Sequence, residues 1–321
     1  MLLETITDLN AVQVSALSEW QVSSVADLAW TPDSSLLAIA TNDRIEMYDP
    51  LTRENLRTLY PQTEGLVNIE FGPGFPASWL LAGTRRGSEA QGFASALELW
   101  RGPDWQPFGI LLGIPRGLID LAYSPDGKRV ATAYGSPVED ENLIELIDPI
   151  SWTVSANLTP GIVQNIAFSP NGKFFAASPD RYNVRIWDLE KGVLAYKFFT
   201  SFTGSINSMQ FSPDGNLLAV GNYDGIVQLY DVNSGVLVRE IPVGAAVESL
   251  AFSPDGRLLA SGSGFQDNSI RLWSVTTGEL LNTLKGHPQA VTSLLFSPDG
   301  KLLVSGSFGG LVRLWGIRPE Q

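Results

Sequence analysis

Phe211-Ser212-Pro213-Asp214-Gly215 (FSPDG), the stretch that decides the fold, occurs again at residues 252–256 and 296–300. Four relaxed copies precede it: WTPDS at 30–34, FGPGF at 71–75, YSPDG at 123–127 and FSPNG at 168–172. The aromatic residues follow one another at steps of 41, 52, 45, 43, 41 and 44 residues. Proline followed by Asp-Gly or Asn-Gly favours a tight reversal, so these copies predict hairpin turns. A period of this length predicts seven units that stack on one another.

Each period contains four segments with the pattern of short strands. An apolar run leads into the aromatic residue, as in 291–296 (VTSLLF), and a second run follows the turn, as in 217–220 (LLAV). A third segment alternates and ends in a pair such as Tyr230-Asp231, and a fourth follows a short turn, as in 236–241. The spacing therefore predicts an all-β chain of seven four-stranded antiparallel sheets.

The chain resembles the WD-repeat family over nearly its whole length. Trp187-Asp188 is the family's signature dipeptide, and relaxed versions stand at Tyr48-Asp49, Ile147-Asp148 and Tyr230-Asp231, whereas Trp273-Ser274 and Trp315-Gly316 lack the aspartate. The resemblance implies a seven-bladed β-propeller around a central channel. Its blades are expected at about residues 24–60, 66–112, 118–158, 162–200, 205–241, 246–284 and 290–316.

The two ends of the chain predict how the ring closes. Only six residues follow Trp315, too few for a fourth strand, while residues 11–17 (AVQVSAL) have the pattern of a strand that precedes the first blade. We predict that this N-terminal strand completes the last blade, because closure removes an exposed sheet edge. No linker rich in Pro, Ser or Gly interrupts the repeat, so we expect one domain over residues 1–321.

Composition narrows the class of protein. The chain has no cysteine, which excludes disulfides, thiolate metal sites and cysteine nucleophiles. No apolar stretch is long enough to span a membrane, and residues 1–10 lack the basic start and apolar core of a signal peptide. A chain whose signal had been removed would look the same, and residues 6–17 resemble the lead-in of some bacterial WD-repeat proteins, several of which are exported. We expect a soluble monomer, and the compartment, cytoplasmic or exported, stays open.

Negative charge is concentrated in the first half of the chain. Of the net charge of −13, residues 1–160 carry −12 and residues 161–321 carry −1. An acidic surface repels phosphate backbones and steers basic partners toward itself, so we expect no nucleic-acid binding and a basic partner. Solubility alone is the other explanation of this acidity.

Few residues offer catalytic chemistry. His287 is the only histidine, which excludes a histidine cluster for zinc. The resemblance places a structural histidine here, hydrogen-bonded to a Ser or Thr of the second strand and to the Trp of the third, and Ser305 and Trp315 match those positions. Gly309 replaces the aspartate of that network. We therefore expect no enzymatic activity and interpret five residues as structural: Trp187, Asp188, His287, Ser305 and Trp315.

A polar residue lies three positions before each turn aromatic, inside the otherwise apolar first strand. These seven residues are Asp27, Asn68, Asp120, Asn165, Ser208, Ser249 and Ser293. Buried polar atoms need partners, so one interpretation is that the ring forms hydrogen bonds between blades. A second is that Asp27, Asn68, Asp120 and Asn165 hold a hard cation such as calcium in the channel.

Two insertions and three tryptophans are candidates for partner contact. Blade 2 carries extra residues at 85–93 and blade 3 an acidic insertion at 135–142. Trp105 and Trp152 occupy equivalent turns between the third and fourth strands, which predicts that they are neighbours on one rim. Trp20 falls in the loop that enters blade 1, on the opposite face. Long loops and exposed aromatics favour binding, whereas neutral drift and roofing of a blade end are the alternatives. The candidates are Trp20, Arg85, Arg86, Phe93, Trp105, Glu139, Asp140, Glu141 and Trp152.

We therefore predict a non-enzymatic scaffold that binds a protein or peptide partner through propeller loops, mainly on blades 1 to 3. One alternative is a propeller that binds a small ligand, sugar or cation at the channel mouth, which a ring of coordinating oxygens would favour. The other is an enzyme that uses channel carboxylates, which a deep pocket with a carboxylate of strongly raised pKa would favour.

Overall fold

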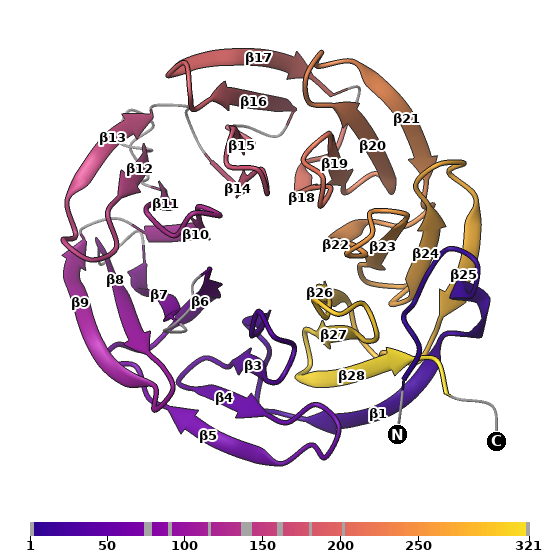
Figure 1. Cartoon of the computed structure of the whole chain (residues 1–321), viewed down its shortest axis with the longest axis horizontal. Helices are drawn as coiled ribbons and strands as arrows, with labels where there is room; N and C mark the ends of the chain where they lie inside the picture. The colour runs from indigo at the N-terminus through magenta and orange to yellow at the C-terminus, as the bar shows by residue number, and fades with distance from the viewer. Residues whose placement is uncertain are drawn as a thin grey trace. The chain divides into compact units, whose positions relative to one another are not determined.

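The computed structural model describes residues 3–73, 79–88, 92–114, 117–135, 143–158, 163–179, 182–200 and 203–318. Its strands form seven four-stranded antiparallel sheets, the blades of a seven-bladed β-propeller (Figure 1). The fold class predicted from the sequence is thereby confirmed. Contacts group the chain into two compact units, one of residues 37–201 and one of residues 1–36 together with 202–321.

Blades 1 to 4 take their strands from residues 27–199. Blade 1 contains β2 (Asp27–Trp30), β3 (Leu37–Ala40), β4 (Ile45–Tyr48) and β5 (Asn55–Leu59). Blade 2 contains β6 (Leu66–Gly72), β7 (Trp79–Ser88), β8 (Gly92–Arg101) and β9 (Gln106–Ile114). Blade 3 contains β10 (Gly117–Tyr123), β11 (Val130–Gly135), β12 (Leu143–Ile147) and β13 (Val154–Leu158). Blade 4 contains β14 (Ile166–Phe168), β15 (Phe174–Ala177), β16 (Asn183–Asp188) and β17 (Val193–Phe199).

Blades 5 to 7 lie in the unit of residues 1–36 and 202–321, which also contains β2 of blade 1. Blade 5 contains β18 (Ile206–Phe211), β19 (Leu217–Asn222), β20 (Ile226–Asp231) and β21 (Leu237–Pro242). Blade 6 contains β22 (Val247–Phe252), β23 (Leu258–Ser263), β24 (Ile270–Ser274) and β25 (Leu280–Leu284). Blade 7 contains β26 (Val291–Phe296), β27 (Leu303–Ser307), β28 (Leu311–Gly316) and β1 (Ser15–Gln21).

The predicted hairpin turns form as their residues require. In blade 6, Gly256 N donates a hydrogen bond to the Ser253 carbonyl oxygen at 2.8 Å, and Gly256 has a φ of +72°, which suits glycine. Ser253 Oγ donates to Asp255 Oδ1 at 2.6 Å and accepts from Leu258 N at 3.0 Å. The same pattern recurs in blades 3, 4, 5 and 7.

The Asp of the signature dipeptide holds the turn between the third and fourth strands. Asp188 is buried, and its Oδ1 accepts hydrogen bonds from Glu190 N at 3.1 Å and Lys191 N at 3.0 Å. Its Oδ2 forms an ion pair with Lys191 Nζ at 2.8 Å. These bonds hold the pKa of the Asp188 carboxyl below its usual value. Trp187 is partly buried and packs near Phe175, with ring centroids 5.9 Å apart.

The last blade is completed by the N-terminal strand, as predicted. β1 pairs antiparallel with β28 from Ser15 opposite Gly316 to Gln21 opposite Leu311, and Figure 1 shows the two strands side by side. The bounds expected for this strand, residues 11–17, are wrong. Residues 11–13 form a 3-10 helix, η1 (Ala11–Gln13), and the strand begins at Ser15.

Packing against blade 6 explains this shift. Ala11 and Val14 are buried in one apolar cluster with Trp315 and Leu284. Asn282 Nδ2, in β25, donates to the carbonyl oxygens of Ala11 at 2.9 Å and Val14 at 3.2 Å. Carbonyl groups of residues 11–14 thus bond to a side chain of blade 6, and pairing with β28 begins at Ser15.

Candidate partner-binding surface

The structure brings the three residues of the expected histidine network together. His287 Nε2 lies 2.6 Å from Ser305 Oγ, and Trp315 Nε1 donates to the same oxygen at 2.8 Å. His287 is buried, and burial, with a smaller contribution from the charge of Arg313, lowers its pKa to about 4. A buried, neutral imidazole bonded to a core serine suits a structural role.

The polar residues of the first strands form hydrogen bonds between neighbouring blades. Asn68 Nδ2 of blade 2 donates to Asp120 Oδ1 of blade 3 at 3.2 Å, and Ile166 N of blade 4 donates to Asp120 Oδ2 at 2.9 Å. Ser249 Oγ of blade 6 donates to the Val291 carbonyl oxygen of blade 7 at 2.9 Å. These contacts favour the structural interpretation of this ring.

The calcium interpretation gains no support from the same geometry. The Asp27 carboxylate accepts a hydrogen bond from Leu28 N at 2.8 Å, and Asp120 Oδ1 accepts one from Leu121 N at 2.9 Å. A cation would share these oxygens with N–H groups that already bond to them. Within the described ranges, no group of three or more His, Cys, Asp or Glu side chains is placed to hold a metal ion. Asn68 and Asn165, the two amides of that interpretation, are not among these four residue types.

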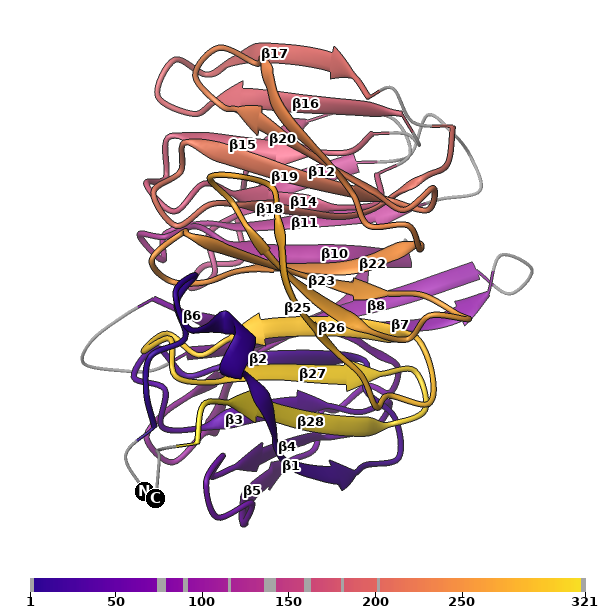
Figure 2. The ribbon, with the colours of Figure 1, turned by 90° about the vertical axis from the view of Figure 1, so that its right-hand side faces the viewer.

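The blade 2 insertion is a strand extension, not the loop that the sequence led us to expect. β7 and β8 pair from Trp79 opposite Arg101 as far as Ser88 opposite Gly92, and Figure 2 shows this hairpin projecting at the right of the view. Arg85 is exposed on β7. Arg86 and Phe93 belong to the paired backbone, but their side chains lie outside the described part of the structure. The blade 3 candidates Glu139, Asp140 and Glu141 lie outside the described residues altogether.

The tryptophans expected on one rim have different surroundings. Trp105 is buried, with 8% of its surface exposed, and packs edge-on against Phe71 at a centroid distance of 5.3 Å. The expectation that it is an exposed anchor is therefore wrong, because Phe71 supplies an apolar partner from another strand of the same blade. Trp152 is partly buried and lies over Gly109 of β9, whose missing side chain leaves room for the indole.

Trp20 also differs from its expected place. It lies within β1, opposite Val312 of β28, and is half-buried, so it belongs to blade 7 and not to a loop that enters blade 1. The misplaced strand bounds explain the error, since a strand that ended at residue 17 would have left Trp20 in the following loop.

Three exposed aromatic side chains lie in one kind of loop in blades 5 to 7, whereas the exposed Tyr60, Phe108 and Tyr182 of blades 1 to 4 lie at three different positions of their blades. In the described part of residues 1–36 and 202–321, the exposed large aromatics are Tyr223 (64% exposed), Phe265 (67%) and Phe308 (65%). All three lie in loops between the second and third strands of consecutive blades. The rings of Phe265 and Phe308 meet edge-on with centroids 6.0 Å apart. We call Tyr223, Phe265 and Phe308, with the adjacent Glu248 of β22, the aromatic surface.

Hydrogen bonds brace the loop that carries Phe265. Arg271 forms a two-point ion pair with Asp267, with Nη1 and Nη2 each 2.9 Å from a carboxylate oxygen. This pair holds the pKa of Asp267 far below its usual value. Asn268 Nδ2 donates to the Pro288 carbonyl oxygen of the neighbouring connection at 3.1 Å. Phe265 is therefore exposed on a loop that an ion pair and a hydrogen bond to the neighbouring connection hold in place.

The loops of Tyr223 and Phe308 are braced as well. Asp224 Oδ2 accepts hydrogen bonds from Thr203 N at 2.8 Å and Gly204 N at 2.6 Å, which ties the Tyr223 loop to the connection that enters blade 5. Phe308 N donates to the Ala290 carbonyl oxygen at 3.0 Å. Three exposed rings on braced loops lose little freedom when a partner covers them, which favours binding.

Glu248 lies beside the loop that carries Phe265. Its side chain is half-buried, and a Cβ built on Gly264, the residue before Phe265, would lie 2.6 Å from Glu248 Oε1. Asn207 Nδ2 donates to Glu248 Oε2 at 3.3 Å. Burial raises the pKa of the Glu248 carboxyl.

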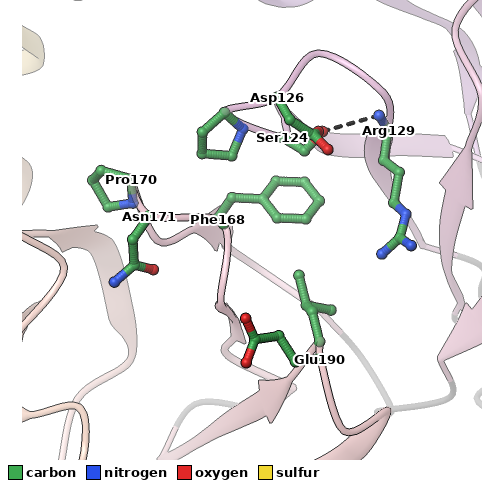
Figure 3. A pocket seen from close by; sticks show the side chains of 10 residues that line it. Ser124, Asp126, Arg129, Phe168, Pro170, Asn171 and Glu190 are labelled. Atoms are coloured by element: carbon green, nitrogen blue, oxygen red, sulfur yellow. Dashed lines mark hydrogen bonds between the residues drawn. The ribbon is translucent and has the colours of Figure 1, made fainter.

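A separate groove lies between hairpin turns of blades 3 and 4. It has a volume of about 420 Å³, and Figure 3 shows Phe168 in its middle with Asp126, Arg129 and Glu190 around it. Asp126 Oδ1 accepts hydrogen bonds from Ser124 Oγ at 2.7 Å and Lys128 N at 3.1 Å, so this carboxylate serves the turn. The groove is lined by turns of blades 3 and 4 and includes none of the seven polar residues of the first strands.

Sequence reasoning missed the aromatic surface for an identifiable reason. Tyr223 and Phe308 directly follow the end of the second strand, in Asn222-Tyr223-Asp224 and Ser307-Phe308-Gly309. The longest insertions of the sequence lie in blades 2 and 3, whereas the loops of Tyr223 and Phe308 have only three residues each, 223–225 and 308–310. A comparison of this single position around the repeat would have found two of the three rings.

Two family models match parts of the chain. The model of the WD domain, G-beta repeat, matches residues 152–188, 236–274 and 278–316. The model of the anaphase-promoting complex subunit 4 WD40 domain matches residues 199–247. A comparison with curated protein sequences gives no match.

Solved structures share the fold. A chain from the crystal structure of a mitotic checkpoint complex aligns over 98% of this chain and 93% of that chain, with a TM-score of 0.76 and 17% sequence identity. At this identity the similarity concerns the fold alone. In the described part of the chain, no helix has the length and apolar character needed to cross a membrane.

Proposed function

Because the chain belongs to the WD-repeat β-propeller family, we propose that it is a non-enzymatic scaffold that binds a protein or peptide partner through the aromatic surface of blades 5 to 7. The observation that carries this proposal is the exposure of Tyr223, Phe265 and Phe308 on braced, consecutive loops. Rings of this kind are enriched among residues that dominate binding energy, because they bury a large area at a small cost in side-chain freedom.

The proposal moves the main contact surface away from blades 1 to 3. The sequence favoured that half for its acidity, its insertions and its tryptophans. Trp105 is buried against Phe71, and Trp20 belongs to blade 7, so two of the three tryptophans no longer support it. The exposed rings of blades 5 to 7 are a stronger argument, because burial of apolar area contributes more to affinity than charge at a solvated rim.

Site-specific photocrosslinking tests the proposal. p-Benzoylphenylalanine replaces Phe265 in the full chain, and in a control chain it replaces Leu237, which is 42% exposed on the outer strand β21. We expect a protein crosslinked from position 265 and absent from position 237. Crosslinks of equal yield from both positions would show that the contact is non-specific and would overturn the proposal.

Binding measurements with the purified partner complete this test. Replacing Phe265 and Phe308 together with Ala should weaken binding by more than about tenfold and leave the melting temperature unchanged, because both rings face solvent. A parallel variant with Ser at Glu139, Asp140 and Glu141 tests the surface first expected on blade 3. If only this second variant weakens binding, the partner docks on blades 1 to 3 and the aromatic surface is not the site.

A further inference from the structure

We propose that the aromatic surface binds a lysine or arginine side chain of the partner, with the cationic group held by Glu248 and the aliphatic stem against Phe265. This inference rests on the proposed function, since it names the partner chemistry that the same surface selects. It follows from the contacts of Glu248 and from the exposed rings of the neighbouring loops.

A chain of hydrogen bonds links Glu248 to the loop of Tyr223. Tyr223 N donates to the Ser205 carbonyl oxygen at 2.9 Å, and Ser205 Oγ donates to Asn207 Oδ1 at 3.2 Å. Asn207 in turn donates to Glu248, whose other oxygen lies over Gly264. Glu248 therefore lies between the loop of Tyr223 and the loop of Phe265.

Glu248 lacks a charged partner in the described part of the chain. Asn207, a neutral amide, is the residue that donates a hydrogen bond to it, and none of the ion pairs found there includes it. A half-buried carboxylate without a cation is costly, and the raised pKa of Glu248 reflects this cost. A cation from a partner would offset this desolvation cost, because an opposite charge stabilises the ionised carboxylate.

The neighbouring rings suit the rest of a basic side chain. Lysine and arginine bury an aliphatic stem along apolar surface while their charged ends stay with a polar group. A ring face within about 6 Å of a cation adds an electrostatic attraction. Phe265 follows Gly264, the residue that Glu248 contacts, and the ring of Phe308 meets that of Phe265, so a partner side chain bound at Glu248 has these two exposed rings on the adjoining loops.

Other partner chemistries fit this surface less well. An acidic or phosphorylated segment would place like charge beside Glu248, which carries a cost in electrostatic energy. A purely apolar segment would bury the Glu248 carboxylate further and leave it unpaired, which carries a large desolvation cost. A basic residue pairs its charge with the carboxylate and packs its aliphatic stem against the rings.

Peptide selection tests the inference without a known partner. Random peptides displayed on phage are selected on the full wild-type chain, and the tightest peptide is synthesised for fluorescence-polarisation measurements. We expect a lysine or arginine to be enriched at one position among apolar residues. Selected peptides without a basic residue would overturn the inference.

A double-mutant cycle then locates the cation. Glu248→Gln in the protein and lysine-to-norleucine or arginine-to-citrulline in the peptide should each weaken binding by about tenfold, and together by little more than either alone. The matched control is Glu279→Gln, which removes an equal charge from the exposed turn between β24 and β25. Additive losses, or an equal loss with Glu279→Gln, would show that the cation does not sit at Glu248.

The same measurements separate the two proposals. If Phe265→Ala with Phe308→Ala abolishes peptide binding and Glu248→Gln leaves it unchanged, the aromatic surface is a docking site. The inference that a basic side chain binds at Glu248 is then wrong. If neither variant changes binding, both proposals fail. Affinity for the wild-type chain should also fall as the pH is lowered through the pKa of Glu248, because a proton then competes with the cation, and this fall should be absent in Glu248→Gln.

Discussion

The glycine of the second strand that lies opposite the polar residue of the first strand determines how closely neighbouring blades approach. Gly262 of β23 lies opposite Ser249, and a Cβ at this position would meet Val291 of blade 7 at 2.9 Å as well as the Ser249 hydroxyl. Gly221 and Gly306 occupy the same register in blades 5 and 7, and a Cβ there would meet Val247 at 2.6 Å and Val25 at 2.7 Å. The first strand of the next blade therefore packs where a side chain would otherwise be.

Replacing Gly262 with Ala should destabilise the protein by about 1–3 kcal/mol, because the new methyl group overpacks this contact and displaces the Ser249 hydroxyl from the Val291 carbonyl oxygen. Urea unfolding measures the change. Gly309→Ala is the control, since a Cβ there would meet the side chain of exposed Gln289 and should change stability by no more than about 0.5 kcal/mol. Equal effects of the two substitutions would contradict the packing argument.

His287 predicts a pH dependence of stability. Its pKa falls from 6.5 to about 4 on folding, so the unfolded chain binds the proton more readily and stability is lost as the pH drops from about 6.5 toward 4. Between about pH 7 and pH 5 the loss should be about 2 kcal/mol. His287→Asn, which keeps an amide near Ser305, should lose less between the same two pH values in urea unfolding. Because the chain has one histidine, no other imidazole contributes, and parallel curves for the two proteins would refute the assignment.

Among the elements, the loop between β23 and β24 links structure to binding. Replacing Asp267 with Ala removes the carboxylate that pairs with Arg271 and should speed amide hydrogen exchange over residues 264–269, because the Asp267 side chain also accepts a hydrogen bond from Ser269 N at 3.2 Å. Overall stability should fall by only about 1 kcal/mol, since both side chains are partly exposed.

Partner affinity supplies the second measurement for this variant. If rigidity of the loop contributes to binding, Asp267→Ala should weaken the selected peptide although Phe265 is still present. Exchange that is unchanged over residues 264–269 would show that the ion pair does not hold the loop. The control Lys301→Ala removes the ion pair with Asp299 in the hairpin turn between β26 and β27, at the other end of those strands, and should leave the exchange of residues 264–269 unaltered.

Two elements differ from their sequence patterns for different physical reasons. The blade 2 insertion has no clear alternation, yet β7 and β8 continue pairing to Ser88 and Gly92, because an extended hairpin satisfies its backbone groups along its length. Residues 11–17 do alternate, yet Ala11 to Gln13 form a 3-10 turn because Asn282 and the apolar cluster of blades 6 and 7 hold them. Neither the opposite strand of the hairpin nor Asn282 belongs to the local sequence pattern, so the pattern could not predict these contacts.

For the whole molecule, closure of blade 7 by β1 leads to a prediction about truncation. Deleting residues 1–21 should lower the melting temperature and promote association, because it exposes the edge of β28 and removes Ile6 and Val14 from their cluster with Trp315. Light scattering and thermal unfolding measure the two effects. Deleting residues 1–4 is the control and leaves in place the hydrogen bond from Ile6 N to the Gly300 carbonyl oxygen. A truncated chain that stays monomeric with an unchanged melting temperature would show that β1 is dispensable.

The sequence by itself determined the number of blades, the four-strand repeat, the hairpin turns and the source of the closing strand. These features depend on local chemistry that repeats, such as the proline and glycine of FSPDG and the short apolar runs around it. The network of His287, Ser305 and Trp315 could also be anticipated, because the resemblance assigns positions within one repeat.

Only the tertiary structure decided which side chains face solvent. Trp105 and Phe265 look alike as aromatic residues in turns, but Phe71 covers the first, whereas the second is 67% exposed. The surroundings of Glu248 come from Asn207 of blade 5 and Gly264 of blade 6, residues about forty and sixteen positions away. Exposure and pairing depend on contacts between distant segments, which a local pattern does not contain, and so the surface proposed for binding could be found only in the folded chain.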